Sequence, residues 1–223
     1  AAVESEVGPI DLAVLNAGVW EQMDVAHWDS TPIREHIATN LLGIVNGLDA
    51  VLPVHEPFQN IPGSWWARLM AVRVDALAQA GRDVDAEVAI ERLRRSKTGG
   101  AYVTPGALAL VSALIDAGKT AQARERLKAI TLSEDETEST LARFDLVKAR
   151  LLQNDGKAEE ALLTFLRIPV LHPGERDAQP AALLGAISCY RALGETTRAD
   201  TARQTLLTQF PESAQAKATA SAP

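Results

Sequence analysis

Three arginines in the second half of the chain, Arg143, Arg150 and Arg191, have the side chains best suited to recognising a charged partner. A guanidinium group is planar and donates two parallel hydrogen bonds, which matches a carboxylate in a side chain or at a chain terminus. These residues therefore favour an acidic peptide as the ligand. The alternative interpretation is that they are solvated surface charges, which contribute little to binding or stability.

Side chains that could catalyse a reaction are not arranged for catalysis. Cys189 is the only cysteine, and its place in a repeated apolar pattern predicts a small buried residue rather than a nucleophile. The acidic residues at 134–138 precede a predicted helix, where acids are favourable. We predict no metal site, because the histidines lack metal-ligand spacing: His27, His36, His55 and His172.

The three arginines belong to a repeat that must position them. Gly81, Gly118, Gly156 and Gly194 are separated by 37, 38 and 38 residues, and an alanine follows each glycine after five residues. Apolar residues four and seven before each glycine, and twelve after it, fall on one helix face. The pattern predicts four helical hairpins that turn at the glycines and stack on one another. Ala86, Ala123, Ala161 and Ala199 should be buried at helix contacts, and residues 98–100 and 104–106 should separate the first two hairpins. An irregular helical bundle is the alternative.

This pattern resembles the tetratricopeptide repeat, whose units have a glycine between paired helices, an alanine five residues on and a closing proline. Pro173 and Pro211 occupy the closing position here, whereas Thr98 and Asp135 stand there in the first two units. The resemblance covers about residues 64–213 and implies a mainly α, solenoid-like domain. In that family, the first helices of successive hairpins line a groove. The resemblance thus implies these partner-binding residues: Arg143, Leu146, Arg150, Gln153, Asn154, Leu184, Ser188 and Arg191. The equivalent outward positions in the first two units are those of Asp75, Gln79, Ser112 and Asp116.

The first part of the chain has a different composition. Residues 1–62 hold nine acidic residues and one basic residue, so the net charge of −7 divides into −8 there and +1 in the remainder. All four tryptophans fall within the first 66 residues. Neither part favours nucleic acid, which requires a basic patch with stacking aromatic residues. No apolar stretch reaches the length of a membrane span.

The stretch 8–19, Gly-Pro-Ile-Asp-Leu-Ala-Val-Leu-Asn-Ala-Gly-Val, followed by Asn40 and by 50–53, resembles the middle of a short-chain dehydrogenase/reductase. The resemblance covers about residues 3–54 and implies a Rossmann-like α/β fragment. In it, Asn16, Ala17 and Gly18 would lie beside a nicotinamide cofactor and Asn40 would join a proton relay. The family's glycine-rich phosphate turn and Tyr-x-x-x-Lys are absent, since glycine stands four residues after both Tyr102 and Tyr190. We therefore expect no cofactor.

We predict four segments: a dehydrogenase-like fragment at 1–56, a linker at 57–63, a tetratricopeptide-like domain at 64–213 and a disordered tail at 214–223. The fragment is a relic, a piece of a domain or a chimeric join. The leading hypothesis for the function is a non-enzymatic scaffold that binds another protein or peptide, soluble in the cytoplasm or periplasm. The alternatives are an oxidoreductase with an appended repeat module and a structural protein of the bacterial envelope.

Overall fold

The computed structural model describes residues 63–221. Residues 1–62 lie outside the described part, and with them the dehydrogenase-like fragment, its candidate residues Asn16, Ala17, Gly18 and Asn40, and nearly all of the predicted linker. The chain divides into two compact units, Ala1–Gly106 and Ala107–Pro223. We call the described parts of these units unit 1 (63–106) and unit 2 (107–221).

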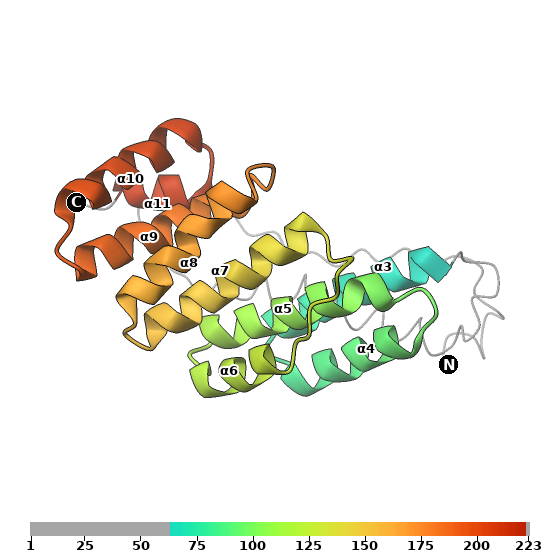
Figure 1. Ribbon diagram of the computed structural model, residues 1–223. Coiled ribbons are helices and arrows are strands. Elements are labelled where there is room, and N and C mark those ends of the chain that lie inside the picture. The colour runs from blue at the N-terminus through green and yellow to red at the C-terminus, as the bar shows by residue number, and fades with distance from the viewer. Residues whose placement is uncertain (1–62, 222–223) are drawn as a thin grey trace, which may run out of the picture. The chain divides into compact units, whose positions relative to one another are not determined.

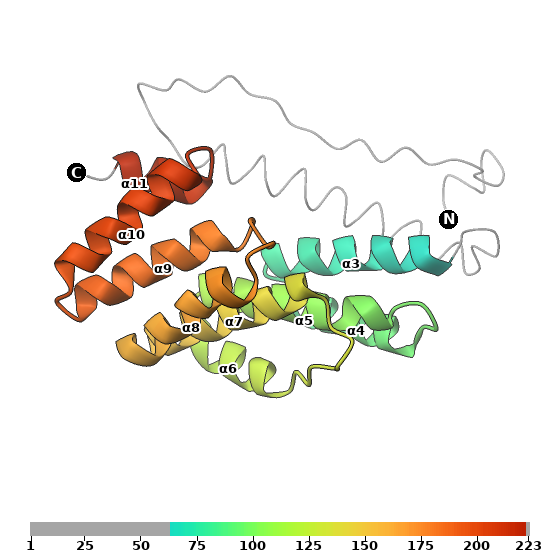
Figure 2. The same cartoon turned by 45° about the horizontal axis from the view of Figure 1, so that its top comes forward.

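The described residues are helical and contain no strand. Helices follow one another as hairpin-like pairs, which Figures 1 and 2 show from two directions. Unit 1 contains the first pair and the start of α5, and unit 2 contains the rest. The helices are α3 (Gly63–Gln79), α4 (Asp83–Arg95), α5 (Gly100–Asp116), α6 (Thr120–Lys128), α7 (Glu138–Asn154), α8 (Ala158–Leu171), α9 (Gln179–Ala192), α10 (Thr196–Gln209) and α11 (Ala214–Ser221).

The four predicted turns are confirmed, and all four use the same backbone geometry. Gly81, Gly118, Gly156 and Gly194 have φ angles of 71°, 73°, 75° and 77°, in the left-handed region that favours glycine. At Gly156, the glycine N–H donates to the Gln153 carbonyl at 3.0 Å, and the next N–H, of Lys157, donates to the Leu152 carbonyl at 3.0 Å. This pair of bonds is the Schellman motif, which satisfies the last carbonyl groups of a helix.

Replacing Gly156 by alanine should lower the free energy of unfolding by about 1–2 kcal/mol, because the left-handed backbone is costly for a residue with a Cβ. No atom lies within 4 Å of the position that a Cβ would occupy, so the cost comes from the backbone alone. Urea unfolding of the purified protein measures it. Gly174→Ala is the matched control, because Gly174 lacks a positive φ and has only an ordinary contact at 3.8 Å. Equal stability of the two variants would contradict the turn geometry.

The alanines that follow the turns are buried where the paired helices meet, as predicted. Ala86, Ala123 and Ala161 are 0% exposed and Ala199 is 1% exposed. A side chain of one carbon lets the second helix of each hairpin approach the first closely. In unit 1, Val74, Leu77 and Leu93 complete the core between α3 and α4 and are all 0% exposed. The repeated positions of the sequence are therefore the interior positions of the hairpins.

One predicted boundary was wrong. Residues 104–106, Thr-Pro-Gly, were expected to help separate the first two hairpins, but they lie inside α5. Pro105 removes only the hydrogen bond to the Ala101 carbonyl, and Ala101 is exposed, so water can satisfy that group. Gly106 is buried, and a Cβ there would lie 3.2 Å from the Val74 side chain. Packing of α5 against α3 within unit 1 thus overrides the turn signal of the local sequence.

The predicted disordered tail was also wrong, because residues 214–221 form α11. The Ser213 hydroxyl accepts a hydrogen bond from the Ala216 N–H at 3.1 Å and so caps the helix. Ala216 is 1% exposed and packs with Ile187, Ala199 and Leu206. This small apolar contact against α9 and α10 holds the helix in place (Figure 2).

Candidate functional site

Unit 2 contains a hollow of about 450 Å³ beside the first helices of its hairpins. Pockets that bind small molecules commonly enclose roughly 300–1,000 Å³. The hollow extends from the end of α5 across α7 and α9 to α11, with one residue from α8. Its lining consists of Asp116, Leu146, Arg150, Gln153, Phe165, Ala181, Leu184, Gly185, Ser188 and Gln215.

Arg150 lines the hollow and is held in place by two residues of α5. Its Nη1 donates to the Ser112 hydroxyl at 2.9 Å, and its Nη2 donates to a carboxylate oxygen of Asp116 at 2.5 Å. The Arg150 side chain is 29% exposed and the Asp116 side chain is 65% exposed, so water screens this ion pair to a large extent. The arrangement ties α7 to α5 and leaves the guanidinium with a carboxylate partner within the protein.

The apolar part of the hollow's lining, which we call its floor, depends on a glycine in the middle of α9. A Cβ at Gly185 would lie 2.3 Å from the Phe165 ring, so no larger residue fits without moving that ring. Phe165 is 1% exposed and belongs to the core between α7, α8 and α9. Leu146, Ala181 and Leu184 complete the apolar part of the lining.

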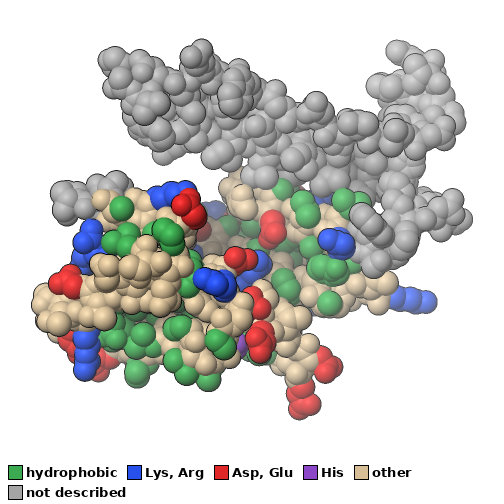
Figure 3. Space-filling view, turned by 90° about the horizontal axis from the view of Figure 1, so that it is seen from above, with side chains coloured by type: hydrophobic (Ala, Val, Ile, Leu, Met, Phe, Trp, Pro, Cys, Tyr) green, Lys and Arg blue, Asp and Glu red, His purple; other side chains and the backbone are tan. Residues whose placement is uncertain are grey.

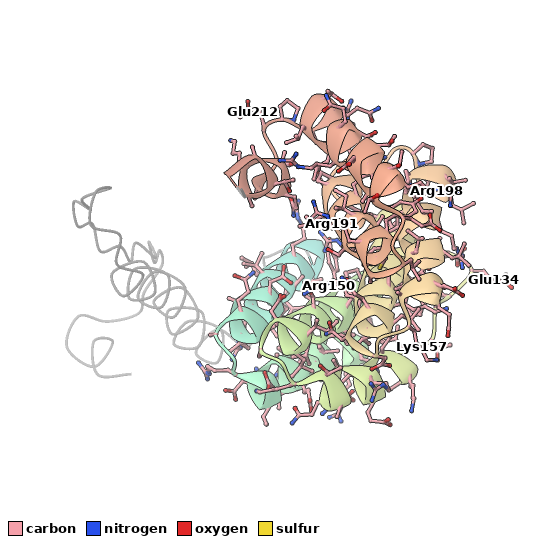
Figure 4. All side chains as sticks on the ribbon, turned by 90° about the vertical axis from the view of Figure 1, so that its left-hand side faces the viewer. Glu134, Arg150, Lys157, Arg191, Arg198 and Glu212 are labelled. Carbon is pink, nitrogen blue, oxygen red and sulfur yellow. The ribbon has the colours of Figure 1, made fainter. Side chains whose placement is uncertain are left out.

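The predicted partner-binding residues fall into two groups in the structure. Arg150, Gln153 and Ser188 line the hollow, together with Leu146 and Leu184. The remaining three are exposed but do not line it: Arg143, Asn154 and Arg191. Figure 4 shows Arg150 and Arg191 on the same side of unit 2, and Lys157 and Arg198 on the other.

Sequence reasoning missed four lining residues: Phe165, Ala181, Gly185 and Gln215. Gln215 was missed because α11 was expected to be disordered. Gly185 lies within an apolar helix and has no turn residues around it. The one feature of the sequence that could have indicated its role is that an isolated glycine within a helix often allows close packing.

Comparisons with family models, with curated proteins and with solved structures found no match. The tetratricopeptide resemblance therefore rests on the repeated glycines and alanines and on the hairpins that they form.

A second hollow, of about 490 Å³, lies along α10 and is lined largely by threonines. Their hydroxyl groups are used within the helix: Thr201 donates to the Thr197 carbonyl at 2.9 Å, and Thr205 donates to the Thr201 carbonyl at 3.0 Å. Bonds of this kind occupy the hydroxyl hydrogens. This surface is consequently less suited to ligand binding than the hollow beside α7 and α9.

Reactive side chains in the described residues are buried or dispersed. Cys189 is 1% exposed, and burial raises the pKa of its thiol, so the reactive thiolate is disfavoured. Within 63–221, no three His, Cys, Asp or Glu side chains are grouped closely enough to hold a metal ion.

Asp145, Arg167 and His172 form a polar contact between α7 and the end of α8. Arg167 Nε lies 3.5 Å and His172 Nε2 lies 4.0 Å from the same Asp145 oxygen. Asp145 and His172 are buried, and His172 Nδ1 has no hydrogen-bond partner. A buried carboxylate close to a guanidinium is a structural contact of this hairpin, and none of the three residues lines either hollow.

Two further observations concern the charged side chains at the surface and the length and apolar character of the helices. Basic and acidic side chains are interspersed over much of the described face seen in Figure 3, and several acidic side chains lie near one another at its lower right. Among the described helices, none combines the length and the apolar character that crossing a bilayer would require.

Proposed function

We propose that this chain is a non-enzymatic helical-repeat scaffold, of tetratricopeptide-like architecture, that holds a segment of another protein. The observation that supports it most is the hollow in unit 2, because first helices of successive hairpins line it. The repeated Schellman turns and buried alanines set a constant hairpin geometry, so side chains of neighbouring first helices face a common surface.

The chemistry of the lining favours binding over catalysis. It consists of apolar side chains, two amides, one hydroxyl group and one ion pair. An apolar floor with a few polar groups at its edge is the usual composition of a recognition site. General acid–base or nucleophilic catalysis would instead need an activated proton donor, acceptor or nucleophile within reach of a substrate.

An acidic partner, which the sequence favours, would depend mainly on Arg191 and Arg143, which do not line the hollow. Arg150 already has a carboxylate partner in Asp116, so part of its attraction for a further acid is used within the protein. Arg191 is exposed on the same side of unit 2 as Arg150 (Figure 4). Partner capture should therefore weaken in Arg191→Glu if acids are preferred, and should be unchanged if Arg191 is a solvated surface charge.

The scaffold proposal is tested by replacing Leu184 with glutamate, which puts a charge into the apolar floor. Capture of partners from a lysate of native cells, measured by quantitative mass spectrometry on the immobilised full chain, should fall about tenfold or more for those that use the hollow. Leu163→Glu is the matched control, since Leu163 is 67% exposed on α8 and does not line the hollow. Identical captured proteins for both variants and the wild type would contradict the proposal.

A further inference from the structure

We infer that the hollow of unit 2 binds an extended, uncharged stretch of polypeptide, whose main chain is recognised by Gln153 and Gln215 and whose single bulky apolar side chain enters the floor. This inference rests on the proposed scaffold function and specifies its ligand. It departs from the acidic peptide that the sequence alone favoured, and it gives α11 a part in recognition.

The charges of the hollow argue for an uncharged ligand. Two charged side chains line it, Arg150 and Asp116, and they form an ion pair with each other. Every other lining residue is apolar or carries a neutral amide or hydroxyl group. A charged ligand would lose water without gaining an unpaired opposite charge from the lining, and such burial is unfavourable. A neutral segment avoids that cost.

The two glutamines argue for main-chain recognition. Within the described residues, neither the Gln153 nor the Gln215 side chain makes a hydrogen bond, and both are partly exposed. An amide offers both a donor and an acceptor, as a peptide group does, so each can bond one peptide unit in both directions. Gln153 lies on α7 and Gln215 on α11, and α9 packs against both helices. The two amides thus come from two different helices that both pack against α9.

The floor of the hollow suits one apolar side chain. Leu146, Ala181, Leu184 and the Phe165 ring make up its apolar lining, and Gly185 lets that ring lie close to α9. Leu184 is 36% exposed although it lies next to a hollow, so a ligand could still cover it. A ligand that buries an apolar side chain in the floor and bonds the two glutamine amides through its flanking peptide units would contact both the apolar and the polar part of the lining.

The test is selection of a random twelve-residue peptide library, displayed on phage, against the full chain. Enriched sequences should share one Leu, Ile, Met or Phe with uncharged neighbours. The best of these peptides, synthesised with blocked ends, should lose about two- to tenfold in affinity on Gln153→Ala or Gln215→Ala, as measured by titration calorimetry. Gln204→Ala, an exposed glutamine on α10 outside this hollow, is the matched control and should bind normally. N-methylation of the peptide bonds beside the apolar residue should weaken binding similarly.

The possible outcomes separate this inference from the scaffold proposal. Enrichment of acidic peptides whose binding is lost in Arg191→Glu would overturn the inference and leave the scaffold proposal standing. Peptides that bind Gln153→Ala and Gln215→Ala as tightly as the wild type would also overturn it. Failure to enrich any peptide would count against both.

Discussion

Replacing Phe165 by alanine should lower the free energy of unfolding by about 3–5 kcal/mol, the largest effect that we expect from a single substitution. Phe165 is 1% exposed and is among the largest fully buried side chains in the described residues. It packs with Ala142, Leu162 and Ala182, which come from three helices, so its removal leaves a cavity that none of them can fill alone. Unfolding in urea, followed by circular dichroism, measures the change.

Leu163→Ala is the control for Phe165→Ala, because Leu163 lies two residues before Phe165 on α8 and is 67% exposed. It should change stability by no more than about 0.5 kcal/mol. If the two variants unfolded at the same urea concentration, the ring would not lie at the centre of the α7, α8 and α9 core, and the description of the hollow's floor would fail with it.

Replacing Ala161 by leucine should be destabilising by about 1–3 kcal/mol, through overpacking rather than through a cavity. Ala161 is 0% exposed at the contact between α7 and α8, where the added carbons have no space. Ala121→Leu is the matched control: Ala121 is exposed and is three residues from its turn glycine on α6, the second helix of its hairpin. A melting temperature for Ala161→Leu equal to that of the control would contradict the close helix approach that defines every hairpin.

The hairpins could be predicted from the sequence because their determinants are local. A glycine that must adopt a positive φ and an alanine five residues later act through the geometry of one turn and one helix pair. The same locality explains why Arg150, Gln153 and Ser188 could be placed on the face of the hollow: their distances from Gly156 and Gly194 fix their direction on a first helix.

The rest of the site depends on contacts between elements that are distant in sequence. The Arg150 ion pair joins residues 34 positions apart, and its formation depends on how α5 and α7 are placed by the connection between their hairpins. Gln215 enters the lining only because one alanine, Ala216, finds a buried place against α9 and α10. No local sequence pattern predicts such a contact. A segment rich in alanine, serine and threonine is equally typical of a disordered tail.

The most direct test of the scaffold proposal is hydrogen–deuterium exchange of the full chain, with and without a saturating amount of the best library-selected peptide. Binding in the hollow should slow exchange in three separate segments, 146–153 on α7, 181–188 on α9 and 213–216 at the start of α11, because a bound ligand suppresses local opening. Exchange along the outer face of α10 should stay the same. Protection confined to α4, α10 or residues 1–62, with these three segments unchanged, would contradict the assignment of the hollow as the binding site.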